Sequence, residues 1–84
     1  MTEVEEFNEK YKNYLEEGHY GLAIHSPKVV AYLDDKFKEL TSVPGFTFTQ
    51  IKTKFGDVRF YAYQNGEGMD TTDIQKDILK ILAE

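Results

Sequence analysis

The chain has 84 residues and a net charge of −5, and it contains six phenylalanines, six tyrosines and no cysteine. A chain of this length is expected to form one small domain, residues 1–84, whose modest core depends on its aromatic side chains. The composition excludes disulfides, thiol nucleophiles and cysteine-ligated metals, and no apolar run is long enough to span a bilayer.

The first expected element is a helix over about residues 3–17. Thr2 and Glu5 form the T-x-x-E pattern of a capping box, and Gly18 follows as a C-terminal stop signal. Apolar side chains recur at helical spacing and form one stripe: Val4, Phe7, Tyr11, Tyr14 and Leu15.

Residues 20–24 form a short apolar stretch that is either a brief strand or a buried connection. Ser26 and Pro27 then mark the start of a second helix, about residues 27–41, with serine as N-cap and proline in the first turn. This helix is expected to end before the turn signal Val43-Pro44-Gly45.

Residues 46–63 are predicted to form a β-hairpin around a two-residue turn at Gly56 and Asp57, since glycine tolerates the positive φ of a type II′ turn. This turn places Phe55 opposite Val58. The period of two then assigns a core face: Ile51, Thr53, Phe55, Val58, Phe60 and Ala62. The opposite, solvated face holds Gln50, Lys52, Lys54, Arg59, Tyr61 and Tyr63.

Two details of the hairpin carry further expectations. Lys54 lies opposite Arg59 in this register, and a like-charge pair destabilises a sheet slightly unless an anion or splayed side chains relieve it. Phe46 and Phe48 are out of phase with the downstream core residues, so we expect a bulge or bend near Thr49.

Residues 65–68 are expected to form a flexible loop before a third helix over about residues 72–83. Thr72 and Gln75 form a second capping-box pattern at the start of this helix. The predicted fold class is therefore α+β, with three helices packed on one face of a two- or three-stranded antiparallel sheet. Residues 20–24 are the candidate third strand, because a two-stranded sheet alone is marginal.

Patterns for catalysis or metal binding are weak. His19 and His25 lack a neighbouring nucleophile and further ligands, so we expect structural roles for them. The carboxylates of residues 34–39 alternate with lysines, as on a solvated helix face, and those of residues 70–77 lack the spacing of a calcium loop. Gly66-x-Gly68 is not a phosphate loop. We expect no enzyme activity, no cofactor and no metal.

Two surfaces could bind a partner. The solvated hairpin face resembles a stacking platform for nucleic acid: Lys52, Lys54, Arg59, Tyr61 and Tyr63. The acidic total of the chain opposes this reading, because it repels phosphates. The first 17 residues hold six glutamates and two lysines, which account for −4 of the net charge: Glu3, Glu5, Glu6, Glu9, Glu16 and Glu17. Such a helix can mimic a phosphate backbone, or it can simply aid solubility.

Residues 50–61, Q-I-K-T-K-F-G-D-V-R-F-Y, resemble the Q-I-K-E-K-F-G-x-L-R-F-Y hairpin signature of small uncharacterised proteins of bacteriophages and prophages. The likeness extends loosely over residues 20–63. Such proteins often continue into a C-x-x-C element that suggests zinc, which this chain lacks, so no zinc role is carried over. The resemblance implies a phage or mobile-element origin and no particular activity.

These observations favour a small acidic, non-enzymatic interaction protein that binds a host or viral protein, with inhibition of that protein as one outcome. The acidic first helix is the candidate contact or nucleic-acid mimic, and the oligomeric state stays open. The alternative is a nucleic-acid-binding domain that uses the basic and aromatic face of the hairpin. We expect a cytoplasmic location, in the host cytoplasm if the chain is viral, and no membrane partner.

Overall fold

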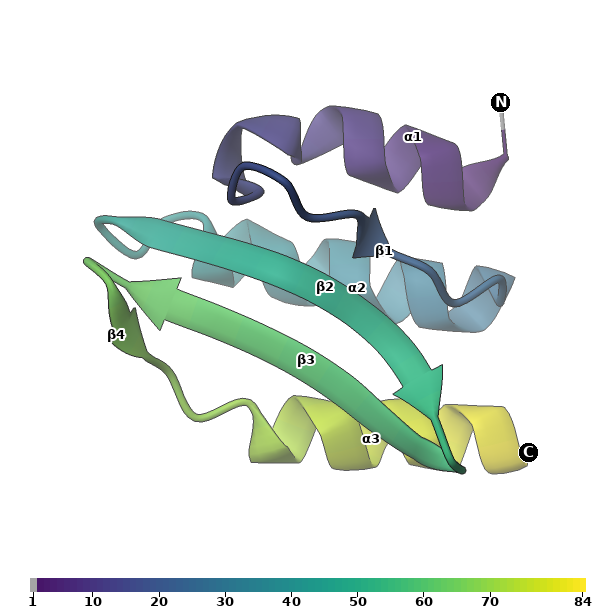
Figure 1. Ribbon diagram of the computed structural model, residues 1–84. Helices are drawn as coiled ribbons and strands as arrows, with labels where there is room; N and C mark the ends of the chain where they lie inside the picture. The colour runs from purple at the N-terminus through teal and green to yellow at the C-terminus, as the bar shows by residue number, and fades with distance from the viewer. Residues whose placement is uncertain (1) are drawn as a thin grey trace.

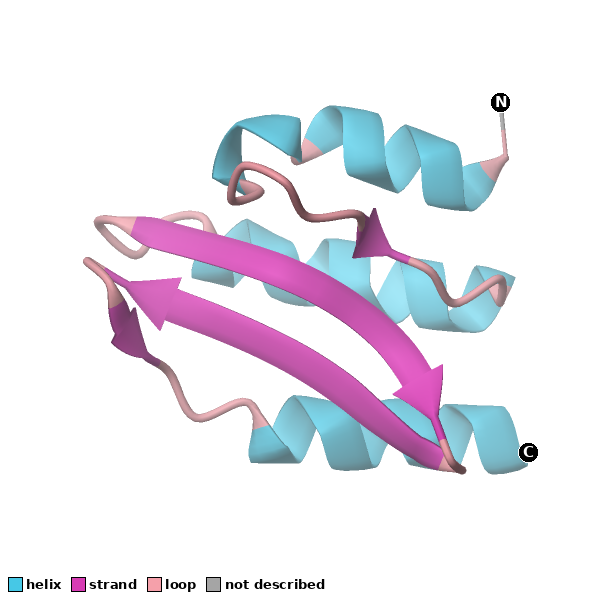
Figure 2. Ribbon diagram, in the orientation of Figure 1, coloured by secondary structure: helices cyan, strands magenta, loops and turns pink. Residues whose placement is uncertain are grey.

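The computed structural model describes residues 2–84, which form three α-helices, a short 3-10 helix and four strands (Figures 1 and 2). The helices are α1 (Glu3–Lys10), α2 (Pro27–Leu40) and α3 (Thr72–Ala83), and the 3-10 helix is η1 (Lys12–Tyr14). The strands are β1 (Gly21–Leu22), β2 (Phe46–Lys54), β3 (Asp57–Gln64) and β4 (Glu67–Gly68). The α+β class is confirmed.

The first helix is shorter than predicted, because α1 ends at Lys10 and not near residue 17. After η1 the chain becomes extended and joins the sheet: Leu15 bridges Phe48 in parallel, and the Glu16 amide donates to the Phe48 carbonyl at 2.9 Å. Backbone pairing with the sheet therefore replaces the last helical turn, which the apolar spacing alone could not indicate.

The sheet has the order β1-β2-β3-β4 and is mixed, whereas a two- or three-stranded antiparallel sheet was predicted. β1 pairs in parallel with β2, so residues 20–24 do contribute a strand, but in the opposite sense to that expected. β4 pairs antiparallel with β3 through a turn at Asn65 and Gly66, both of which have positive φ. The predicted loop over residues 65–68 is therefore a second, tight hairpin, the form that Asn-Gly favours.

The main hairpin turns one residue earlier than predicted. Lys54 pairs with Asp57, so the two turn residues are Phe55 (φ 53°) and Gly56 (φ 76°). Positive φ at both positions is the type I′ geometry that matches the strand twist. Phe55 consequently leaves the core face, where it was expected, and is 94% exposed.

The new register moves each cross-strand partner by two residues, so the division into two faces is retained. Lys52, and not Lys54, lies opposite Arg59. The predicted irregularity near Thr49 is confirmed, since the pairing shifts between Phe48 and Ile51. Two residues of β2 there face one of β3, and this bulge brings Phe48 onto the core face with Ile51.

The core lies between the sheet and α2, which Figure 1 shows behind β2 and between α1 and α3. Phe37 of α2 is fully buried at its centre, with its ring centroid 5.0 Å from those of Phe7 and Phe48 and 6.0 Å from that of Phe60. The helices thus cover one face of the sheet, and residues 2–84 place no helix over the other face of β2 and β3 (Figures 1 and 2).

The helix starts follow the predicted caps in two cases of three. Thr2 and Glu5 form the capping box of α1, and Ser26 caps α2 with Pro27 in the first turn. At α3 the predicted capping role of Thr72 is wrong. Thr71 holds the N-cap position, and its hydroxyl donates to the Phe60 carbonyl at 2.7 Å, which fastens the helix to β3.

The outer edge of β1 is occupied by a side chain of α1. The Leu22 amide donates to Asn8 Oδ1 at 2.8 Å, and Asn8 Nδ2 donates to the Leu22 carbonyl at 3.0 Å. Gly21 is required beside this amide, because a Cβ on it would lie 2.6 Å from Asn8 Oδ1 and its φ is +78°.

Candidate interaction surfaces

The predicted acidic site is divided by the fold. Glu3, Glu5, Glu6 and Glu9 lie exposed on α1, whereas Glu16 and Glu17 follow η1. The Glu16 carboxylate accepts a hydrogen bond from the Thr47 hydroxyl at 3.2 Å, so it borders the sheet and not the helix surface. The six glutamates therefore do not form one strip.

Two of the four glutamates on α1 already have local partners. Glu5 completes the capping box, and the hydrogen bonds from Thr2 hold the pKa of its carboxyl below the ordinary value. Glu9 forms an ion pair with Lys12 at 2.7 Å. Among the described residues, Glu3 and Glu6 form no ion pair, and they are the glutamates of α1 that remain available to an outside partner.

A groove of about 320 Å³ runs between α1 and α2 beside these two glutamates. Its apolar lining comes from both helices: Phe7, Pro27, Val30 and Ala31. Its charged lining consists of Glu3, Glu6, Lys10 and Asp34. The free carboxylates therefore border an apolar surface, which neither the helical spacing nor the charge pattern predicted.

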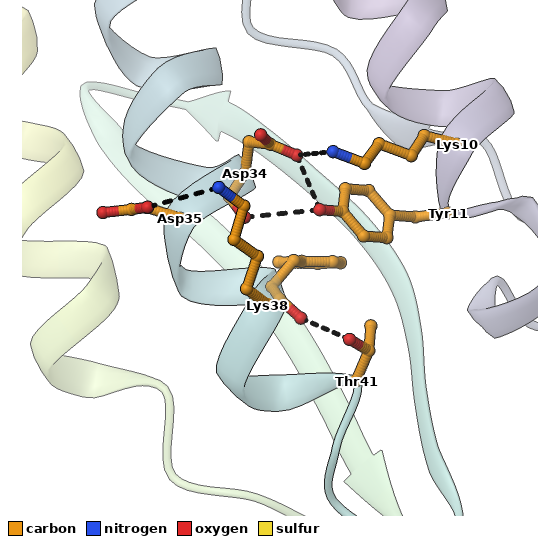
Figure 3. Close-up of polar contacts among 7 residues, drawn as sticks. Lys10, Tyr11, Asp34, Asp35, Lys38 and Thr41 are labelled. Atoms are coloured by element: carbon orange, nitrogen blue, oxygen red, sulfur yellow. Dashed lines mark hydrogen bonds and ion pairs between the residues drawn. The ribbon is translucent and has the colours of Figure 1, made fainter.

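Asp34 and Lys10 join the two walls of this groove (Figure 3). Lys10 Nζ lies 2.8 Å from Asp34 Oδ1, and the buried Tyr11 hydroxyl donates to the same oxygen at 2.6 Å. The bonds from Lys10 and Tyr11 hold the pKa of the Asp34 carboxyl below its usual value. Burial, together with the Asp34 bond, raises the pKa of Tyr11. These groups stabilise the α1–α2 packing.

The predicted nucleic-acid site is brought together on the uncovered face of the sheet. Lys52 and Arg59 are direct cross-strand partners, and both are partly exposed. Neither they nor Lys54 forms an ion pair within residues 2–84. Tyr61 is 44% exposed, and Tyr63 is partly exposed two residues further along β3. This group of cations and rings is called the sheet face below.

Phe55 is a surface residue that the sequence reasoning assigned to the core. Its ring stands at the tip of the β2–β3 hairpin, and Lys54 Nζ lies 5.6 Å from the ring centroid. A Phe-Gly pair is an unusual occupant of a type I′ turn, where Asn-Gly is preferred. The neighbouring Asn65-Gly66 turn shows the preferred form in the same chain.

The remaining sequence candidates do not assemble into a site. His19 and His25 are exposed, and Asp77 accepts a hydrogen bond from the Tyr32 hydroxyl at 2.6 Å. Asp70 accepts one from the Thr72 amide at 3.0 Å, close to the start of α3. Over residues 2–84, no group of three or more His, Cys, Asp or Glu side chains is arranged to hold a metal ion.

Comparison with known proteins gives no relative. No protein-family model, curated protein or solved structure matches this chain. In the described part of the chain, the helices are too short or too polar to cross a membrane.

Proposed function

We propose that this chain is a small non-enzymatic interaction protein, of phage or mobile-element origin, that binds a cationic surface of a host or viral protein through α1. One observation carries the proposal: Glu3 and Glu6 are exposed and without ion pairs at the border of a groove with an apolar lining. Carboxylates beside apolar surface suit a partner segment that presents lysine or arginine next to aliphatic side chains.

The same arrangement supports mimicry of nucleic acid. Residues three apart on a helix lie on one side, so the two free carboxylates project together, as neighbouring phosphates would. This protein would occupy a basic groove that normally binds nucleic acid and would inhibit the protein that contains the groove. Nucleic acid and this protein should therefore compete for binding to that partner.

The test is affinity capture with two charge-matched variants. Glu3→Lys with Glu6→Lys reverses the free carboxylates of α1. Glu39→Lys with Glu67→Lys makes the same change of charge at exposed positions on α2 and β4, away from the groove. The wild type should capture one dominant protein from nuclease-treated bacterial lysate. The control pair should retain that protein, and the α1 pair should lose it.

Fold integrity is checked by thermal unfolding, because a lysine in the first turn of a helix costs about 0.3–1 kcal/mol. Equal capture by both pairs would remove α1 from the mechanism. If added DNA fails to displace the captured protein, mimicry is excluded while protein binding through α1 remains. Glu5 is left unchanged, since its replacement would break the capping box.

A further inference from the structure

We infer that the sheet face, together with Phe55, is a second binding site and that its ligand is single-stranded nucleic acid. This site lies on the side of the sheet opposite the helices, so it is separate from the groove between α1 and α2 (Figure 1). Its chemistry is also opposite, since it presents cations where α1 presents carboxylates.

Within residues 2–84, the cations of this face form no ion pair, and the same holds for Lys36, Lys76 and Lys80. The other lysines, Lys10, Lys12, Lys28 and Lys38, each form an ion pair elsewhere on the protein. Lys52 and Arg59 instead oppose one another directly across β2 and β3. Like charges in this position repel, and a bound phosphate would remove the repulsion while gaining two cationic contacts.

Two tyrosines continue the face along β3. Arg59, Tyr61 and Tyr63 alternate along one strand, so neighbouring members lie about 7 Å apart. Tyr63 lies opposite Gly68, which has no side chain to pack on its ring, and a Cβ at Gly68 would meet nothing within 4 Å. An open hollow of about 270 Å³ lies along this edge of β3, lined by residues that include both tyrosines and the segment leading into α3. Such rings are suited to stack on unpaired bases.

Phe55 adds a ring at the hairpin tip and a reason to regard that ring as functional. A phenylalanine with positive φ is held in a strained conformation, and its 94% exposure means that packing does not compensate. Asparagine would fit the turn better. The Phe55 ring therefore does not contribute to the packing of the fold. It lies beside cations that form no ion pair within residues 2–84.

The arrangement favours a single strand over a duplex. The rings can be used only by bases that are unstacked, and residues 2–84 contribute no helix to this face that could enter a groove (Figure 2). The cations lie toward the Lys54–Asp57 end, and Glu16 borders the other end through Thr47. The bound nucleic-acid strand should therefore run along β3 from Arg59 toward Tyr63 and end there.

The experiment measures fluorescence anisotropy of a labelled oligo-dT of about 12 nucleotides with the full chain. Binding should be seen at about 0.05 M salt, with log K falling against log salt with a slope of about −2 for three phosphate contacts. Tyr61→Ala should weaken binding at least about fivefold, whereas Tyr20→Ala, at a tyrosine 86% exposed outside this face, should not. Arg59→Ala should weaken it, and Lys80→Ala on α3 should not.

Phe55→Asn separates binding from folding. This variant should bind more weakly than the wild type while its melting temperature is unchanged or raised, which a merely damaged fold could not produce. Three results would overturn the inference: no binding at low salt, equal losses in the control variants, or equal affinity for the matching duplex. A concentration-dependent dimer that Lys52→Glu abolishes would also overturn it, by assigning the face to a second copy of the chain.

Discussion

At the scale of single residues, Asp34 joins α1 to α2 by accepting hydrogen bonds from Lys10 and from the buried Tyr11 hydroxyl. Asp34→Ala should lower the free energy of unfolding by about 1–3 kcal/mol, because it leaves that hydroxyl poorly paired. Asp35→Ala is the matched control. Its carboxylate is 82% exposed and 3.7 Å from Lys38, so its removal should change stability by less than about 0.5 kcal/mol.

The pH dependence of this effect has a definite sign. The pKa of Asp34 is lower in the folded chain than its ordinary value of 3.8, so the ionised form stabilises the fold above that value. The contribution is lost as the pH falls through the folded pKa. Urea unfolding of the wild type and Asp34→Asn should therefore differ at neutral pH, and the difference should shrink progressively as the pH falls below about 4. A difference that persists undiminished in acid would contradict the role given to the charge.

At the scale of elements, the β2–β3 turn is the least favourable local structure in the chain. Phe55→Asn should raise the free energy of unfolding by about 0.5–1 kcal/mol, because asparagine tolerates positive φ and the lost ring is 94% exposed. Phe55→Ala should give no comparable gain, since alanine lacks the short polar side chain that lets asparagine hydrogen-bond the local backbone at positive φ. Chemical denaturation of the three proteins measures the difference, and a destabilised Phe55→Asn would show that the ring packs on the hairpin.

The register of the same hairpin predicts opposite effects for one substitution at two neighbouring lysines. Lys52→Glu places a carboxylate opposite Arg59 and should stabilise the hairpin by about 0.2–1 kcal/mol. Lys54→Glu places one opposite Asp57 and should destabilise it by a similar amount. Both effects should shrink at high salt. Thermal unfolding at two salt concentrations tests both effects. If Lys54→Glu proved the more stabilising of the two substitutions, the register predicted from the sequence would be the correct one.

α2 and α3 lie within a residue of their predicted bounds. Helical periodicity indicated both, and the Ser26-Pro27 start and the Pro44-Gly45 stop marked the ends of α2, because these signals act over a few residues. The end of α1 and the parallel pairing of β1 depend on contacts with β2, about 30 residues away, which no local pattern encodes. The Asn65-Gly66 turn had a local signal, the dipeptide itself, that would have revealed the second hairpin.

For the candidate surfaces too, the features set by local sequence patterns were predictable, and those set by contacts between distant residues were not. Alternation along β2 and β3 correctly predicted that Lys52, Arg59, Tyr61 and Tyr63 share a face, since that face survives a shift of two residues in pairing. The exposed position of Phe55 depends on which two residues form the turn, and the sequence allowed two choices. The groove beside Glu3 depends on how α1 packs on α2, which is a tertiary relation.

At the scale of the whole molecule, one aromatic side chain connects both helical and sheet parts of the core. Phe37 contacts rings from α1, β2 and β3 and has no exposed surface. Phe37→Ala should therefore lower the free energy of unfolding by about 3–5 kcal/mol, a large part of the stability of a small domain. Leu82→Ala, at a side chain 40% exposed, should cost much less. Equal midpoints in urea would refute this view of the core.

The side-chain amide of Asn8 ends the sheet at β1. It occupies both backbone groups of Leu22 that another strand would use, so this edge offers no template for growth. At the other edge, β4 is two residues long, and Thr71 and Gln75 both donate to the Phe60 carbonyl of β3. Aggregation by strand addition is thus hindered on both sides, and a partner must approach this protein through a face.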